Sequence, residues 1–95
     1  MTPEEKVHRF RSITDRMVEL YENKNFLYGD SFARTYKKYG PVAAMVRMTD
    51  KMNRLDAMYN APQADDLGES IMDTLTDLAN YAIMTMIAIE ENGEG

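Results

Sequence analysis

The sequence predicts an all-α protein, a small helical bundle of three long helices and one short helix that is completed by dimerisation. Apolar residues recur every three or four positions in four segments, which is the spacing of one side of an α-helix. No segment shows the strict alternation of apolar and polar residues that is typical of a half-buried strand. At 95 residues, the chain is expected to form one domain, residues 1–95, with its core over about residues 3–90.

Composition excludes several classes of protein. The chain has no cysteine, which excludes a disulfide framework and a thiolate metal site. A formal net charge of −5 argues against direct nucleic-acid binding, which normally needs a basic face. The longest apolar stretch, residues 81–89, is about half a membrane span, and the first residues lack the apolar region of a signal peptide. We therefore expect a cytoplasmic protein, inside a cell or an infected host, that does not contact the membrane.

The first long helix is expected to begin after Thr2 and to end near Lys24. Thr2 can serve as the N-cap, Pro3 fits the first turn, and Glu5 completes a capping box with Thr2. One side of this helix is apolar, at Val7, Phe10, Ile13, Met17, Leu20 and Tyr21.

A loop and the short helix are expected next. Residues 23–30 read as a loop, because Gly29 permits unusual backbone angles and Asp30 or Ser31 can cap the next helix. Residues 32–39 have the spacing of a short helix with aromatic residues on one side, namely Phe32, Tyr36 and Tyr39.

The second long helix is expected from Pro41 to about Met58. Gly40 stops the short helix, and proline is favoured in a first helical turn. Its apolar side contains Val42, Met45, Met48 or Thr49, Met52 and Leu55. Residues 60–65 then read as a turn-rich loop.

The last helix is the most apolar of the four. Asp66 can cap it, with Glu69 at the capping-box position, and residues 90–95 form a polar tail. Over residues 79–89 the helix is apolar around most of its girth, which a domain this small cannot cover on all sides. We therefore expect a partner surface, most simply that of a homodimer or a higher homo-oligomer.

Two sets of polar residues on the last two helices are the candidate functional residues. Each set repeats at three or four positions, so each falls on one side of its helix. The sets are Arg47, Asp50, Lys51 and Arg54, and Glu69, Asp73, Asp77 and Asn80.

The first set has two interpretations. It can be a solvated helix face held by ion pairs one turn apart. Alternatively, Arg47, Lys51 and Arg54 hold phosphate oxygens while Asp50 orients them or binds a metal.

The second set also has two interpretations. Asp73 and Asp77 lie one turn apart, where like charges repel, and aspartate is a poor residue for the middle of a helix. These acids can pair with the cations of the neighbouring helix, or they can bind a divalent metal. A ligand set made only of oxygen atoms would suit Mg²⁺ or Mn²⁺.

The loop before the short helix is a third candidate site. Tyr28 and Asp30 flank Gly29, and aromatic and short polar side chains in this arrangement could stack on a base and bond to its edge. A tight turn followed by a helix cap explains the same residues without a ligand.

Three stretches resemble the nucleotide modification associated domain 1 family, which is common in phages and bacteria. They are Tyr28-Gly29-Asp30-Ser31-Phe32, the segment from Val46 to Leu55 (VRMTDKMNRL) and the segment from Glu69 to Ala82 (ESIMDTLTDLANYA), and the last is the most specific. The resemblance covers roughly residues 15–88. That family is similar in turn to the all-α nucleoside triphosphate pyrophosphohydrolases of the MazG and dimeric dUTPase type.

The resemblance implies a helical bundle that dimerises, binds Mg²⁺ through acidic motifs on two helices and cleaves between the α and β phosphates of a nucleotide. The resemblance also implies that Asp50 stands near the first acidic motif and that Glu69, Asp73 and Asp77 stand for the second. The sequence departs from those enzymes in the first motif, where they carry several glutamates and this chain offers Asp50 alone among cations. A single metal, or direct binding of phosphates by the cations, is therefore easier to build than a site with two or three metals.

Three functions are compatible with the sequence. The first is a Mg²⁺- or Mn²⁺-dependent pyrophosphohydrolase that acts on a non-standard nucleotide. Its metal ligands would be Asp50, Glu69, Asp73 and Asp77, its phosphate-binding residues Arg47, Lys51 and Arg54, and its base- or sugar-binding residues Tyr28, Asp30, Asn80 and Tyr81. The second is an oligomer that binds or sequesters a nucleotide or another phosphorylated small molecule without cleaving it. The third is a purely structural protein whose polar sets pair with each other.

Overall fold

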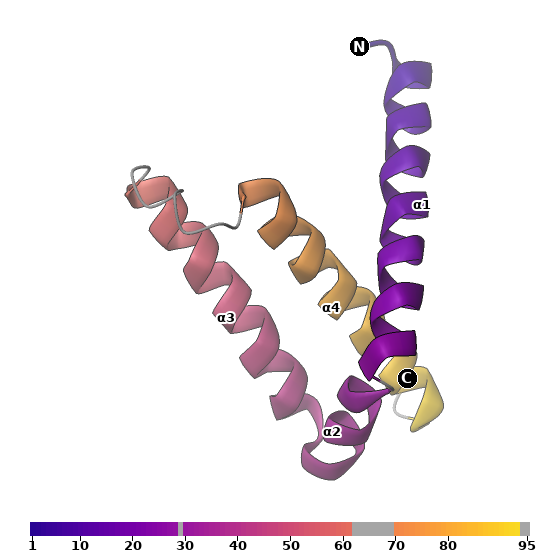
Figure 1. The fold of residues 1–95 in the computed structure, drawn as a ribbon, viewed down its shortest axis with the longest axis vertical. Helices are drawn as coiled ribbons and strands as arrows, with labels where there is room; N and C mark the ends of the chain where they lie inside the picture. The colour runs from indigo at the N-terminus through magenta and orange to yellow at the C-terminus, as the bar shows by residue number, and fades with distance from the viewer. Residues whose placement is uncertain (29, 62–69, 94–95) are drawn as a thin grey trace. The chain divides into compact units, whose positions relative to one another are not determined.

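The computed structural model describes residues 1–28, 30–61 and 70–93, and Figure 1 shows its helices. The elements are α1 (Pro3–Tyr28), α2 (Ser31–Tyr39), α3 (Pro41–Asn60) and α4 (Ile71–Glu91). No strand occurs in the described ranges, so the predicted all-α class with three long helices and one short helix is confirmed. None of the described helices combines the length and the apolar character that crossing a membrane requires.

The chain divides into two compact units, Met1–Asp30 and Ser31–Gly95. The first unit contains α1, and the second contains α2, α3 and α4. The expectation of one domain over residues 1–95 stays a prediction.

Helix α1 begins as the sequence predicts and ends later. The backbone N–H of Glu5 donates to Thr2 Oγ1 (3.1 Å), and the N–H of Thr2 donates to Glu5 Oε1 (3.2 Å), which confirms the capping box. The predicted end near Lys24 is wrong, because the helix continues to Tyr28. Asparagine only weakly disfavours a helix, and no glycine or proline lies between Lys24 and position 29, so nothing in the sequence stops the helix earlier.

The second unit begins with two helices joined by one glycine. Gly40 has a φ of +78°, a value that glycine adopts without a steric cost, and its N–H donates to the carbonyl oxygen of Tyr36 (2.6 Å) at the end of α2. Pro41 then opens α3, as predicted. Helix α3 ends at Asn60, two residues beyond the predicted Met58.

Helix α4 is capped by Ser70. The Ser70 hydroxyl oxygen accepts a hydrogen bond from the backbone N–H of Asp73 (3.0 Å), and the helix begins at Ile71. The prediction that Asp66 caps this helix is therefore wrong. Asp66 and Glu69 lie outside the described residues, so the capping-box role of Glu69 stays a prediction.

Replacing Ser70 with alanine should lower the free energy of unfolding by about 1 kcal/mol, because one backbone N–H at the start of α4 loses its acceptor. Urea denaturation followed by circular dichroism measures this loss. Ser70→Asp is the matched control, since aspartate caps equally well and should retain the stability. A Ser70→Ala variant as stable as the parent would show that the cap contributes nothing.

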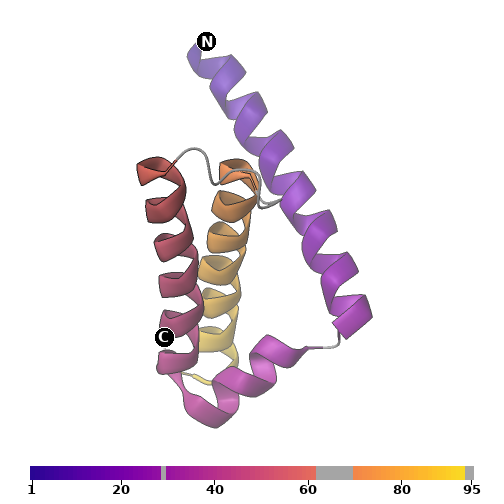
Figure 2. The same ribbon diagram turned by 60° about the vertical axis from the view of Figure 1, so that its left-hand side comes forward.

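Helices α3 and α4 run antiparallel and lie side by side, as both views show (Figures 1 and 2). Helix α2 contacts both of them. The buried cluster where the three helices meet consists of Tyr36, Ala44 and Ala88. Phe32, Met48 and Ile89 pack against that cluster. Apolar burial at this junction holds α2 to the α3–α4 hairpin.

The register between α3 and α4 is defined by three pairs. Ala44 and Ala88 share the buried cluster, and Lys51 contacts Asp77. Farther along, the hydroxyl of Thr74, which is fully buried, lies 3.9 Å from Met58 Sδ and donates to the carbonyl oxygen of Ser70 (3.1 Å). Residues later in α3 therefore contact residues earlier in α4.

This register places the described residues of the two polar sets on the same side of the hairpin. Each helix has a line of residues that contact the other helix. When two right-handed helices run antiparallel, residues on the same side of that line, each helix being viewed along its own chain direction, lie on the same face of the pair. On α3, one side of the contact line is occupied by Arg47, Asp50 and Arg54. On α4, the corresponding side is occupied by Asp73 and Asn80. The described residues of both sets therefore lie on one face of the second unit.

Candidate functional site

The candidate site is the polar face of the α3–α4 hairpin, which we call the polar flank. It is formed by two adjacent helices, because each helix has a polar residue about once per turn on the side that belongs to this face. Its members are Arg47, Asp50, Lys51 and Arg54 on α3, and Asp73, Asp77, Asn80 and Tyr81 on α4. Among these residues, Lys51 and Asp77 contact each other, and Arg47 and Tyr81 line one cavity.

An ion pair joins the two helices in the middle of the polar flank. Lys51 Nζ lies 3.1 Å from Asp77 Oδ2, and the two side chains are only 22% and 21% exposed. A carboxylate at this depth is costly unless a cation compensates it. Pairing between acids of α4 and cations of α3, one of the two interpretations of the second polar set, is therefore present for Asp77.

One turn along the hairpin from this pair lies a small cavity of about 50 Å³. It is lined by residues of all three helices, namely Ser31, Phe32, Thr35, Ala43, Arg47 and Tyr81. The rings of Phe32 and Tyr81 are 5.7 Å apart and tilted by 49°, which closes one wall. The other walls carry a guanidinium group and side-chain hydroxyls.

The chemistry of this cavity suits an anionic oxygen. Arg47 offers several fixed N–H donors, and the hydroxyls of Ser31, Thr35 and Tyr81 can each donate one hydrogen bond. A volume near 50 Å³ holds a small polar group but not a base, so most of a larger ligand would lie outside, over the polar flank.

Three predicted site residues are not placed on the polar flank. Glu69 lies outside the described residues. Asp30 is exposed and belongs, like Tyr28 at the end of α1, to the first unit. Contacts of Tyr28 and Asp30 with a base stay predictions.

The described acids do not by themselves form a metal centre. Among residues 1–28, 30–61 and 70–93, no three acidic or histidine side chains are grouped so that they could hold a metal ion. Asp77 contacts Lys51, and both Asp50 and Asp73 are exposed. Mg²⁺ or Mn²⁺ binding by Asp50, Glu69, Asp73 and Asp77 stays a prediction.

Sequence reasoning missed the contribution of α2 to the cavity. Ser31 reads as a helix cap and Phe32 as a core aromatic, and Thr35 carries no signal of its own. Residues 31, 32 and 35 share one side of a helix, which was the available signal. The sequence does not say that this side meets Arg47 and Tyr81, because that contact depends on how α2 packs on the hairpin.

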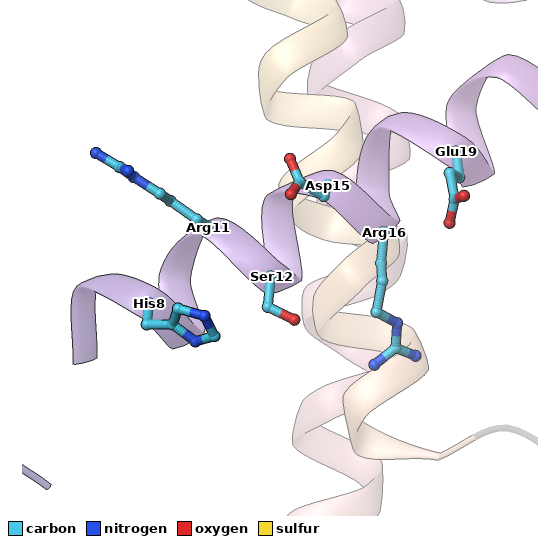
Figure 3. Close-up of a pocket in the computed structure, with 6 residues that line it drawn as sticks. All are labelled: His8, Arg11, Ser12, Asp15, Arg16 and Glu19. Carbon is cyan, nitrogen blue, oxygen red and sulfur yellow. The ribbon is translucent and has the colours of Figure 1, made fainter. Parts of the chain in front are cut away.

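A second group of polar side chains lines a shallow, open hollow along α1 (Figure 3). Its residues are His8, Arg11, Ser12, Asp15, Arg16 and Glu19. Figure 3 shows Arg11 and Arg16 pointing in different directions, so the charged groups do not converge on one point. Mixed charges three and four residues apart are typical of a solvated helix face.

Breaking the ion pair should destabilise the second unit. Asp77→Asn should lower the free energy of unfolding by about 1–2 kcal/mol, because a half-buried ammonium loses much of its charge compensation. The double variant Lys51→Met with Asp77→Asn should lose less than the sum of the two single variants. Urea denaturation of all four proteins measures this coupling, and strictly additive losses would show that the pair contributes no interaction energy.

Comparison with known proteins identifies a family for most of the second unit. A family model described as nucleotide modification associated domain 1 matches residues 24–89, which include all of the described residues of the polar flank. The comparison with curated proteins gives no match. The comparison with solved structures gives none either.

Proposed function

The chain belongs to the nucleotide modification associated domain 1 family, and from that premise we propose that it binds a non-standard nucleotide through its phosphates on the polar flank. The family description points to nucleotides, and phosphates are the part of a nucleotide that arginine and lysine recognise most readily. The base and sugar then lie along the hairpin, beside Asn80 and Tyr81.

The observation that carries this proposal is the cavity between α2 and the hairpin. It joins Arg47 to three hydroxyl-bearing side chains within a described, packed part of the chain. A guanidinium and neutral hydroxyls together donate to an anion without adding a competing carboxylate. A terminal phosphate oxygen bound there would leave the rest of the nucleotide over Lys51 and Arg54.

The Lys51–Asp77 pair would respond to such a ligand. Asp77 Oδ2 lies 3.1 Å from the Lys51 ammonium. A phosphate carries more negative charge than a carboxylate and competes with it for Lys51. Binding therefore shifts Lys51 toward the ligand and releases Asp77 for other contacts.

A second candidate function is cleavage of the bound nucleotide between its α and β phosphates, as in pyrophosphohydrolases of the MazG type. This function is favoured by Asp73 and Asp77, which lie one turn apart on α4 and belong, like Asp50, to the polar flank. Mg²⁺ is commonly held by one or two carboxylates together with the phosphates of its substrate. The described acids would therefore suffice only if the nucleotide brought the metal with it.

One experiment separates these functions. The purified chain is incubated with canonical, modified and cyclic nucleotides, with Mg²⁺, with Mn²⁺ or with a chelator. Thermal shift reports binding and mass spectrometry reports whether the ligand stays intact. Stabilisation with intact ligand supports the binding function, and conversion to a monophosphate only with metal supports the hydrolase. Absence of any shift across the panel would overturn both and favour a structural role.

A further inference from the structure

We propose that the Lys51 ammonium takes the place that a divalent metal ion would need on the polar flank, so that the flank binds phosphates without metal. This role of Lys51 rests on the proposed function, because it requires that phosphates bind on the polar flank. It favours the binding function over cleavage that depends on Mg²⁺ or Mn²⁺.

The Lys51–Asp77 pair already occupies the carboxylate that a metal would use. Lys51 Nζ lies 3.1 Å from Asp77 Oδ2. A Mg²⁺ ion binds a carboxylate oxygen at about 2.1 Å, so an ion at Asp77 Oδ2 would lie within about 5 Å of the ammonium. The two cations would repel each other, and water screens this repulsion only partly because the side chains are 22% and 21% exposed. A divalent ion therefore binds at Asp77 only if Lys51 moves away.

The other acids of the polar flank do not replace Asp77 as the centre of a metal site. Asp50 and Asp73 are both exposed, whereas Asp77 is the one acid in the described part of the chain that is not. Within that part, no three acidic or histidine side chains are grouped so that they could hold a metal ion. A metal on this flank would have to rely on the carboxylate that Lys51 already neutralises.

The cavity end of the flank offers phosphates a positive charge without an acid. Among the described residues that line the cavity, Arg47 is a cation and none is an acid. Arg47, Lys51 and Arg54 follow one another at four and three residues on α3, so they form a row about 10 Å long. Such a row supplies the positive charge that a metal ion otherwise supplies to phosphates.

The charge of Lys51 stays in the middle of the flank whichever anion it contacts. Without a ligand it neutralises Asp77. When a phosphate draws the ammonium toward itself, the same positive charge lies beside the phosphate. In both states it repels a second cation from this position.

Metal binding without any nucleotide tests the role of Lys51. Lys51→Met should bind Mn²⁺ at least about tenfold more tightly than the parent, because Asp77 loses its ammonium and the ion loses a repelling neighbour. Electron paramagnetic resonance of free Mn²⁺ measures this change, and circular dichroism checks that the variant is folded. Lys51→Gln takes its place if the methionine variant does not fold.

Three controls accompany this measurement. Lys51→Arg keeps the positive charge and should bind Mn²⁺ as weakly as the parent. Arg34→Met removes an exposed charge of α2 and should also leave Mn²⁺ binding unchanged. The double variant Lys51→Met with Asp77→Asn should lose the gain. Equal Mn²⁺ affinity in the parent and Lys51→Met, or a gain that persists in the double variant, would overturn the proposed role of Lys51.

Inorganic triphosphate tests whether the flank binds phosphates without metal. Isothermal titration should give an affinity in chelator that is equal to or higher than the affinity in excess Mg²⁺, because Mg²⁺ competes with the protein for the phosphates. Binding only with Mg²⁺ would overturn this role of Lys51 and leave the phosphate site standing. Absence of binding in both buffers would instead overturn the phosphate site, and with it the metal-free binding proposed here.

Discussion

Replacing Tyr36 with alanine should lower the free energy of unfolding by about 3–5 kcal/mol. Tyr36 is only 2% exposed and forms the buried cluster with Ala44 and Ala88, and its ring lies 6.3 Å from that of Phe32. Removing the ring leaves a cavity where α2 meets the hairpin, and two alanines cannot fill it. Small domains are stable by only about 5–15 kcal/mol, so this loss is a large part of the total. Urea denaturation followed by circular dichroism measures it.

Tyr39 supplies a matched control for Tyr36. It lies on the same helix, is 64% exposed and has the Lys38 ammonium over its ring, 5.3 Å from the ring centre. Tyr39→Ala should therefore cost about 1 kcal/mol or less. Equal losses in the two variants would show that α2 does not dock through Tyr36. An unfolded Tyr36→Ala variant can be replaced by Tyr36→Leu, which should lose less.

Replacing Arg47 with methionine should weaken nucleotide binding about 10- to 100-fold, if the nucleotide binds as proposed. Hydrogen bonds to a charged group contribute about 1.5–3 kcal/mol, and each 1.4 kcal/mol is a tenfold change in affinity. Among the described residues that line the cavity, Arg47 alone is a cation, and its side chain is exposed, so the fold should survive its loss. Isothermal titration with the best nucleotide of the panel measures the effect.

Arg34 is the control for this variant. It is an exposed arginine of α2 and does not line the cavity, so Arg34→Met removes the same charge from the same unit. Long-range electrostatics alone would weaken both variants alike, and screening by salt would diminish both effects. A specific contact weakens only Arg47→Met. Affinity unchanged in Arg47→Met would contradict the placement of phosphate in the cavity.

The sequence predicted much of the polar flank, because helical spacing is a local property. Arg47 and Lys51 are one turn apart on any helix that spans them, and so are Asp73 and Asp77. Which acid meets which cation is not local. The contact of Lys51 with Asp77 depends on the register of α3 against α4, and the joining of Ser31 and Thr35 to Arg47 depends on the packing of α2.

Two helix ends show where local signals were insufficient. Helix α1 continues past Lys24, because weak helix formers such as Asn23 and Asn25 do not stop a helix that is already formed. Helix α4 is capped by Ser70 although Asp66 is an equally good capping residue. Several residues in a row can cap a helix, and propensity alone does not choose among them.

By itself, the sequence determined the all-α class, the four helices, the capping box of α1 and the break at Gly40, since each depends on residues a few positions apart. Only the tertiary structure decided the cross-helix pairs, the cavity at Arg47 and the choice of Tyr36 rather than Tyr39 as the buried aromatic. The physical reason is that burial and pairing across helices depend on the packing of segments far apart in the chain, which the spacing within one helix does not encode.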